Sequence, residues 1–161
     1  MGAVNNYNTE FPQRTLKLLK SFQDKKIDYN LNVTFLMNCL LGLIVTAVEN
    51  SERRQLITDN VDDDLLNLLP ENIELKIGNQ DLSILPKATL KARAKLSTLK
   101  KIRNAIAHQH VEPTNQNNNW IGVTLWNVNP QNEIDFRIKL TTAQLNSLAT
   151  YITSNYLQAN N

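Results

Sequence analysis

The sequence predicts a mainly α fold: an up-and-down four-helix bundle with a β-hairpin inserted before the last helix, in a single domain over residues 1–161. Three observations lead to this prediction. Four long segments are rich in apolar residues or repeat them at helical spacing. Two short stretches near the C-terminal end alternate apolar and polar residues instead. No internal repeat and no long Pro/Gly/Ser linker divides the chain, and 161 residues suit one domain with its own core.

The first two helices are expected at residues 12–24 and 31–51. The first interleaves leucines with basic residues, which predicts one apolar face. The second contains VTFLMNCLLGLIVTAV, which is apolar nearly all round, is interrupted by Asn38, and is shorter than the roughly 20 residues of a membrane span. Such a helix is typical of a bundle centre or an oligomer interface. Its Cys39, the only cysteine, excludes an intramolecular disulfide and is expected to be a small buried hydrophobe.

The middle of the chain is less regular. Residues 53–86 are acidic and broken by proline and glycine, so we expect one short helix near 62–69 and irregular chain after it. Residues 87–108 are rich in Ala, Leu, Lys and Arg, which predicts the clearest helix of the chain. Its apolar stripe consists of Ala92, Leu96, Leu99, Ile102 and Ile106.

The alternating stretches predict two strands. WIGVTLW, residues 120–126, and EIDFRIKL, residues 133–140, are joined by VNPQN and are expected to pair as a hairpin. The Asn-rich TNQNNN before them, residues 114–119, is expected to be a mobile connection, or a loop that closes over a substrate. Thr141 and Gln144 have the spacing of a capping box, so the last helix should follow at residues 142–157.

Charge is unevenly distributed in this chain. The formal net charge of +2 is too small to indicate nucleic-acid binding by itself. No acidic residue occurs between Asp81 and Glu112, however, and seven basic residues do: Lys87, Lys91, Arg93, Lys95, Lys100, Lys101 and Arg103. The third long helix is therefore predicted to be strongly basic, either as a solvated face or as an approach surface for an anionic ligand.

The end of this helix, KKIRNAIAHQHVEP, contains the only two histidines. Helical geometry places Arg103 at the margin of the apolar stripe and puts Asn104 and His108 on one face. His110 would return to the face of Arg103 if the helix continued, so the two histidines are predicted to lie on different faces. Asn104 is placed to orient the ring of His108 or a ligand. Arginine for a phosphate and histidine for proton transfer are the parts of a metal-free RNA cleavage site, although such residues are more often structural.

The residues RNAIAH resemble the signature of the HEPN superfamily, in which an arginine and a polar residue precede a histidine by four to six intervening positions near the end of the third main helix. Arg103, Asn104 and His108 match this pattern with four intervening residues, and His110 fits with six. The apolar NVTFLMNCLLGLIVTAVE followed by RNAIAHQHVEP looks like plasmid- and defence-associated members in particular. The helical organisation covers most of the chain, whereas the motif covers six residues.

The resemblance implies a helical homodimer in which two motifs face each other across a cleft and form a composite endoribonuclease site that needs no metal or other cofactor. Such proteins are often toxins or defence effectors, encoded beside a nucleotidyltransferase antitoxin. By carry-over, Arg103 would bind the phosphate, His108 (or His110) would be the catalytic acid and base, and Asn104 would orient them. The candidates for RNA binding are Lys95, Lys100 and Lys101. A cytoplasmic protein without a membrane partner is expected, because the N-terminus lacks a signal-peptide pattern.

Two other hypotheses fit the same residues. A HEPN-like dimer could bind a nucleotide or a partner protein without cleavage, or the chain could be a structural helical dimer in which Arg103 caps a neighbouring helix. Trp120 and Trp126 are predicted to share one face of their strand, where they would pack on a helix, fill a dimer interface or stack on RNA bases.

Overall fold

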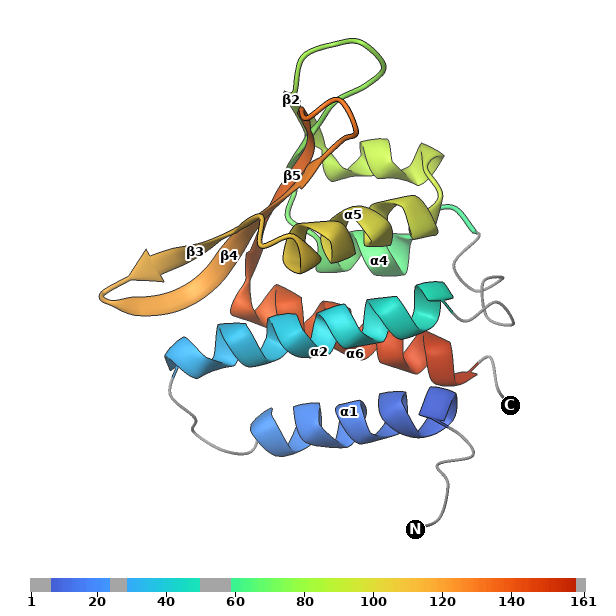
Figure 1. Ribbon diagram of the computed structural model, residues 1–161, viewed down its shortest axis with the longest axis vertical. Helices are drawn as coiled ribbons and strands as arrows, with labels where there is room; N and C mark the ends of the chain where they lie inside the picture. Colours follow the sequence, from blue (N-terminus) through green and yellow to red (C-terminus); the bar gives the residue numbers. More distant parts are fainter. Residues whose placement is uncertain (1–6, 24–28, 50–58, 159–161) are drawn as a thin grey trace.

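The computed structural model describes residues 7–23, 29–49 and 59–158. In chain order these form α1 (Tyr7–Gln23), α2 (Tyr29–Glu49), α4 (Asp63–Leu68), β1 (Asn72–Leu75), β2 (Ser83–Pro86), the 3-10 helix η2 (Lys87–Ala92), α5 (Lys95–Ala107), β3 (Val111–Gln116), β4 (Asn119–Val128), β5 (Ile134–Thr141) and α6 (Thr142–Gln158). Figure 1 shows the sheet at one end of the molecule, α5 beside it, α2 and α6 in the next layer and α1 outermost.

The fold is α+β, so the prediction of a mainly α four-helix bundle is wrong. The described strands form one antiparallel sheet in the order β2-β1-β5-β4-β3. Its β4–β5 hairpin was predicted, but β1 and β2 lie in residues expected to be irregular. Each has four residues, too few to show an alternation. They form strands because β1 pairs with β5 and buries Ile73 and Leu75 in the core.

Strand β3 was also missed, because it includes Pro113 and half of the Asn-rich segment. A proline argues against a central strand, but β3 is at the edge of the sheet, where a missing N–H is tolerated. The connection from β3 to β4 is a tight turn, in which Asn117 and Asn118 have φ of 51° and 62°. Asparagine adopts positive φ more readily than most residues, which suits a two-residue hairpin turn. The predicted mobile connection is therefore mostly strand and turn.

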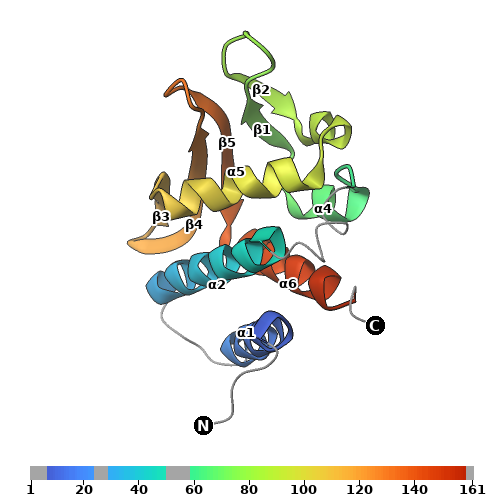
Figure 2. The same ribbon diagram turned by 45° about the vertical axis from the view of Figure 1, so that its right-hand side comes forward.

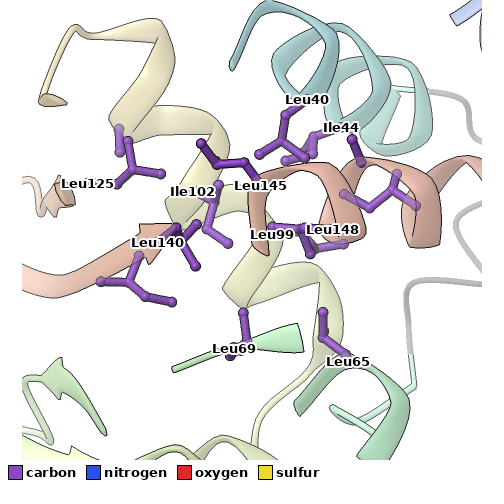
Figure 3. Close-up of a cluster of buried hydrophobic side chains, with 14 of the residues drawn as sticks. Leu40, Ile44, Leu65, Leu69, Leu99, Ile102, Leu125, Leu140, Leu145 and Leu148 are labelled. Carbon is purple, nitrogen blue, oxygen red and sulfur yellow. The ribbon is translucent and has the colours of Figure 1, made fainter. Parts of the chain in front are cut away.

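Helix α2 is central, as predicted, although residues 50 and 51 of the expected span lie outside the described part of the chain. It packs against α1, α5, α6 and β4. Figure 3 shows its Leu40 and Ile44 in one cluster with apolar side chains of α5, α6 and the sheet. Cys39 is partly buried, and this burial raises the pKa of its thiol to about 11. None of the helices in the described ranges combines the length and apolarity of a membrane span.

The predicted helix over residues 87–108 is two helices. After η2, Arg93 and Ala94 are extended, and α5 begins at Lys95. The reason is a tertiary contact, since the backbone of residues 59–61 pairs with this segment: the Val61 N–H donates to the Arg93 carbonyl at 3.0 Å, and the Lys95 N–H to the Asp59 carbonyl at 2.8 Å. Ala92 is consequently exposed and does not join the apolar stripe.

The capping box of the last helix is confirmed. The Gln144 N–H donates to Thr141 Oγ1 at 3.2 Å, and the Thr141 N–H donates to Gln144 Oε1 at 2.9 Å. Helix α6 therefore begins directly at the end of β5 and runs beside α2 (Figure 2). This arrangement places α5 between the sheet and the α2–α6 pair, with its C-terminal end near the start of β3.

Candidate active site

Helix α5 is ended by a residue whose backbone is in the left-handed conformation. His108 is the C-cap, and Gln109 follows with φ of 59°. The Gln109 N–H donates to the Ile106 carbonyl at 3.1 Å, and the His110 N–H donates to the Ala105 carbonyl at 2.8 Å. These two bonds are the Schellman pattern, which satisfies the last carbonyls of a helix and turns the chain sharply. The helix therefore ends before Pro113 has any influence, and Val111 already belongs to β3.

Arg103 and Asn104 lie in the last full turn of α5 and are both half-buried. Arg103 Nη1 donates to Asn104 Oδ1 at 3.0 Å. The Asn104 backbone carbonyl accepts the N–H of His108 at 2.9 Å. The expected contact of the Asn104 side chain with the His108 ring is thus replaced by a contact with the guanidinium, so Asn104 orients Arg103.

The two histidines lie side by side, and the prediction that they occupy different faces is wrong. Their ring centroids are 6.0 Å apart. The prediction assumed a helix continuing to His110, whereas the turn at Gln109 redirects the chain. His108 is exposed, while His110 is half-buried and stacks on Trp126, with centroids 5.9 Å apart and an angle of 14° between the rings. The structure therefore brings Arg103, Asn104 and both histidines to one end of α5.

The basic residues of this region are largely paired within the chain. Lys101 forms an ion pair with Asp135, whose other oxygen accepts a hydrogen bond from Asn127 Nδ2 at 2.7 Å. This network fastens α5 to β4 and β5. Lys87 and Lys91 pair with Glu71 and Asp63 respectively. Of the three lysines predicted to contact RNA, Lys100 alone is exposed.

Lys95, which is itself buried, belongs to a partly buried cluster at the N-terminal end of α5. Its Nζ lies 2.5 Å from Asp62 Oδ2, and the hydroxyl of Tyr151 on α6 donates to the same carboxylate at 3.2 Å. Asp62 is also the N-cap of α4, where it accepts the Leu65 N–H at 2.8 Å. Lys95 therefore stabilises the junction of α4, α5 and α6, and the structure does not bring it together with the histidines.

This cluster perturbs the ionisation of its members. Burial alone would raise the pKa of Asp62, but the hydrogen bonds from Lys95 and Leu65 and the lysine charge hold it below its ordinary value. Burial alone would lower the pKa of Lys95, yet its bonds with Asp62 and Tyr151 raise it. Burial raises the pKa of Tyr151. The first two shifts keep the Asp62–Lys95 pair charged, and the third keeps the Tyr151 hydroxyl protonated.

The two tryptophans do not share a face, contrary to the prediction. Thr114 pairs with Gly122 and Asn115 with Trp120, so Ile121 is an extra residue in β4. This β-bulge reverses the alternation on its N-terminal side. Trp120 accordingly packs against the core, and Ile121 is exposed. Trp126 stays on the other face and stacks on His110.

Comparison with models of protein families shows the family to which this chain belongs. A family model described as HEPN pEK499 p136 matches residues 1–161. The chain belongs to this HEPN family. The resemblance inferred from RNAIAH is thereby confirmed. Neither the curated proteins nor the solved structures contained a match.

In this HEPN protein, the sequence predicted a site of four residues at the end of α5 but did not single out the residues that surround Trp126. Glu112, Thr124 and Arg137 line a groove with it on the face of the sheet opposite the core. The alternation of β4 and β5 places Thr124, Trp126 and Arg137 on that face, but Glu112 required knowledge of β3. Within the described ranges, no three His, Cys, Asp or Glu side chains are grouped as metal ligands would be.

Proposed function

We propose that this HEPN protein is an endoribonuclease that needs no metal ion and acts as a toxin or defence effector. The observation that supports the proposal is the cluster of Arg103, Asn104, His108 and His110 at one helix end, in a chain of a HEPN family. The site is proposed to be composite, with the motifs of two protomers facing each other across a homodimer interface. A nucleotidyltransferase-type antitoxin is the proposed regulator.

The proposed reaction is a transesterification of RNA. The ribose 2′-oxygen bonds to the neighbouring phosphorus while the bond from phosphorus to the 5′-oxygen breaks, which leaves a 2′,3′-cyclic phosphate and a 5′-hydroxyl end. One histidine takes the proton of the 2′-hydroxyl, and a protonated histidine gives one to the leaving 5′-oxygen. We assign His108 to this chemistry, because it is exposed whereas His110 is stacked on Trp126. His110 is the alternative.

Arg103 would stabilise the negative charge that builds on the phosphate oxygens in the transition state. Asn104 acts through Arg103, since its Oδ1 accepts from Nη1 and limits the directions in which the guanidinium can point. Lys100, exposed one turn before Arg103, is the foremost candidate to attract the RNA backbone. Lys101 is held by Asp135 and Lys95 by Asp62, so we assign them smaller parts in RNA binding.

The test is RNA cleavage by purified protein in the presence of a chelator. Arg103→Ala and His108→Ala should each lower the cleavage rate by about 10²- to 10⁴-fold, the range of a lost proton-transfer or charge-stabilising group. Arg14→Ala is the matched control, because Arg14 is an exposed arginine on α1 that pairs only with Glu10 in the described chain. It should leave cleavage unchanged.

Three outcomes would contradict parts of this proposal. Wild-type protein that neither cleaves RNA nor arrests bacterial growth would refute the enzyme assignment, and RNA binding without cleavage would favour a binding module. A loss confined to His110→Ala would move the catalytic role to that histidine. A monomer at micromolar concentration in light scattering would refute the composite site.

A further inference from the structure

The face of the sheet that the helices leave open continues from the candidate active site. Helices α2, α5 and α6 contact the sheet from one side, and that side carries its buried residues (Figures 1 and 2). On the opposite side a row of neighbouring residues crosses β4, β5, β1 and β2 and begins at His110, the residue just before β3. After His110, whose carbonyl accepts the Trp126 N–H, the cross-strand neighbours are Trp126, Arg137, Glu74 and Ile84. One of the two motif histidines is thus the first member of this row.

A groove follows this row beside Trp126. Its volume is about 370 Å³. We call it the sheet-face groove; its lining is Glu112, Thr124, Trp126, Ile134 and Arg137. It adjoins a smaller hollow of about 240 Å³, which shares Thr124 and Arg137. The larger part falls within the range of roughly 300–1,000 Å³ that small-molecule sites occupy.

The charges in the groove indicate what it can hold. Arg137 Nη1 lies 2.7 Å from Glu74 Oε2, so its positive charge is already balanced. Glu112 is exposed, and no ion pair joins it to another residue of the described chain. A phosphate would be repelled by this carboxylate. A flat ligand with N–H donors suits the groove instead, because Trp126 offers a ring for stacking and Glu112 offers acceptors.

A nucleobase has this chemistry, and guanine suits the carboxylate best. Its N1–H and N2–H₂ groups are adjacent donors, which one carboxylate can accept together; no other standard base has this pair. The ring of His110 stacks on Trp126 and does not line the groove, so a base stacked on Trp126 within the groove would share this indole ring with His110. Its own phosphate would then be directed away from Glu112 and towards the end of α5.

We propose that the sheet-face groove binds an unpaired guanine base of single-stranded RNA next to the phosphate that is cleaved, with Trp126 as the stacking residue and Glu112 as the reader of the base edge. The position beside the cleaved phosphate rests on the proposed ribonuclease function, whereas the binding of guanine does not. The proposal therefore assigns a base preference to a motif that by itself recognises only phosphate and ribose.

The experiment separates binding from cleavage. RNA hexamers with a 2′-O-methyl group at every position cannot undergo the transesterification, so their Kd reports binding alone. We would compare UUGUUU with UUAUUU, UUCUUU and UUUUUU by fluorescence anisotropy. The guanine hexamer should bind about tenfold more tightly, which is typical of one well-placed pair of base hydrogen bonds. Cleavage of the unmethylated hexamers by wild-type protein is measured in parallel.

Two variants test the roles of the groove residues. Glu112→Gln changes an exposed side chain without altering its size, so it should fold normally; it should remove most of the guanine preference and leave the other three Kd values nearly unchanged. Trp126→Ala should weaken all four hexamers by about tenfold, since stacking on an aromatic ring tolerates every base. Asp81→Asn, an exposed acid far along the chain from both sites, is the control and should change no Kd.

Equal Kd values for the four hexamers, or a guanine preference that survives Glu112→Gln, would overturn the proposal. So would a change of oligomeric state in Trp126→Ala without a change in RNA binding, because the open sheet face would then be an interface between copies of this chain. A guanine preference without any cleavage would support the groove and refute the ribonuclease function. Cleavage without a base preference would support the ribonuclease function and refute the guanine site in the groove.

Discussion

Asp62 and Asp63 are neighbours whose removal should have very different effects on stability. Each pairs with a lysine, and those lysines are four residues apart in the sequence: Asp62 pairs with Lys95 at 2.5 Å and Asp63 with Lys91 at 2.7 Å. The surroundings differ. The side chain of Lys95 is 11% exposed, whereas those of Lys91 and Asp63 are 54% and 75% exposed. We predict that Asp62→Ala is strongly destabilising and Asp63→Ala is nearly neutral.

The magnitude follows from the contacts that Asp62→Ala removes. Loss of the N-cap bond to Leu65 costs about 1 kcal/mol. A fully buried lysine left without its partner costs roughly 3–5 kcal/mol, but Asp62 is 43% exposed, so solvent screening reduces this to about 2 kcal/mol. The free energy of unfolding should therefore fall by about 3 kcal/mol in Asp62→Ala. In Asp63→Ala it should fall by less than about 0.5 kcal/mol, as for exposed ion pairs.

Urea denaturation followed by circular dichroism measures both values. For a chain of this size the Asp62→Ala midpoint should fall by about 1.5 M, with an unchanged slope. Asp62→Asn separates the two contributions, because asparagine is as good an N-cap as aspartate but has no charge. Equal destabilisation by Asp62→Ala and Asp63→Ala would refute the reasoning, since burial of Lys95 would then have no energetic consequence.

The same pair predicts a dependence on pH. The pKa of Asp62 is lower in the folded chain than its ordinary value of 3.8, so its contribution to stability is present above that pH and is lost as the pH falls further. The pKa of Lys95 is raised above 10.5, so its contribution is complete below that pH and is lost as the pH rises beyond it. The stability difference between wild type and Asp62→Asn should be constant near neutral pH and shrink below about pH 4.

Three further substitutions test other features of the fold. Gln109→Gly should stabilise the chain by about 0.5–1 kcal/mol, or roughly 1–4 °C in Tm, because an L-residue in the left-handed region is strained. A lower Tm would show that the Gln109 side chain contributes more to stability than the strain costs. Gly122→Ala should lower Tm sharply, with a cost of about 3 kcal/mol or more, because the new Cβ would lie 2.2 Å from the backbone oxygen of Leu140; unchanged Tm would mean that β4 and β5 separate freely. Asp135→Ala should destabilise by about 2–4 kcal/mol in urea, because it leaves Lys101 without its partner; a neutral result would mean that this pair does not hold α5 to the sheet.

Local sequence patterns predicted the elements whose side chains repeat over many residues. The apolar run of α2, the alternation of β4 and β5 and the capping box of Thr141 and Gln144 were each visible in the sequence. These features depend on near neighbours along the chain. The composition of α5 was equally clear, but its start was misplaced because Arg93 and Ala94 are extended by pairing with residues 59–61, some thirty positions earlier.

The candidate site was likewise predictable from the sequence only in part. The spacing of Arg103, Asn104 and His108 was readable, and the family match confirms the relationship that it implied. The relative position of His108 and His110 could not be read from the sequence. One residue with positive φ, Gln109, ends the helix and brings the two rings together. The run of basic residues also overstated the positive charge that a ligand would meet, since most lysines of this segment are paired with acids distant in the sequence.

The sequence by itself determined the HEPN relationship, the central apolar helix, the hairpin and the four residues of the motif. Only the tertiary structure decided that the fold is α+β, that Trp120 faces the core while Trp126 stacks on His110, and that Lys95 lies in a partly buried ion pair with Asp62. The physical reason is that β1, β2 and β3 are too short or too polar to form strands alone. They exist because pairing satisfies their backbone groups: β3 pairs with β4, β1 with β5, and β2 with β1. Such pairing has no local signature.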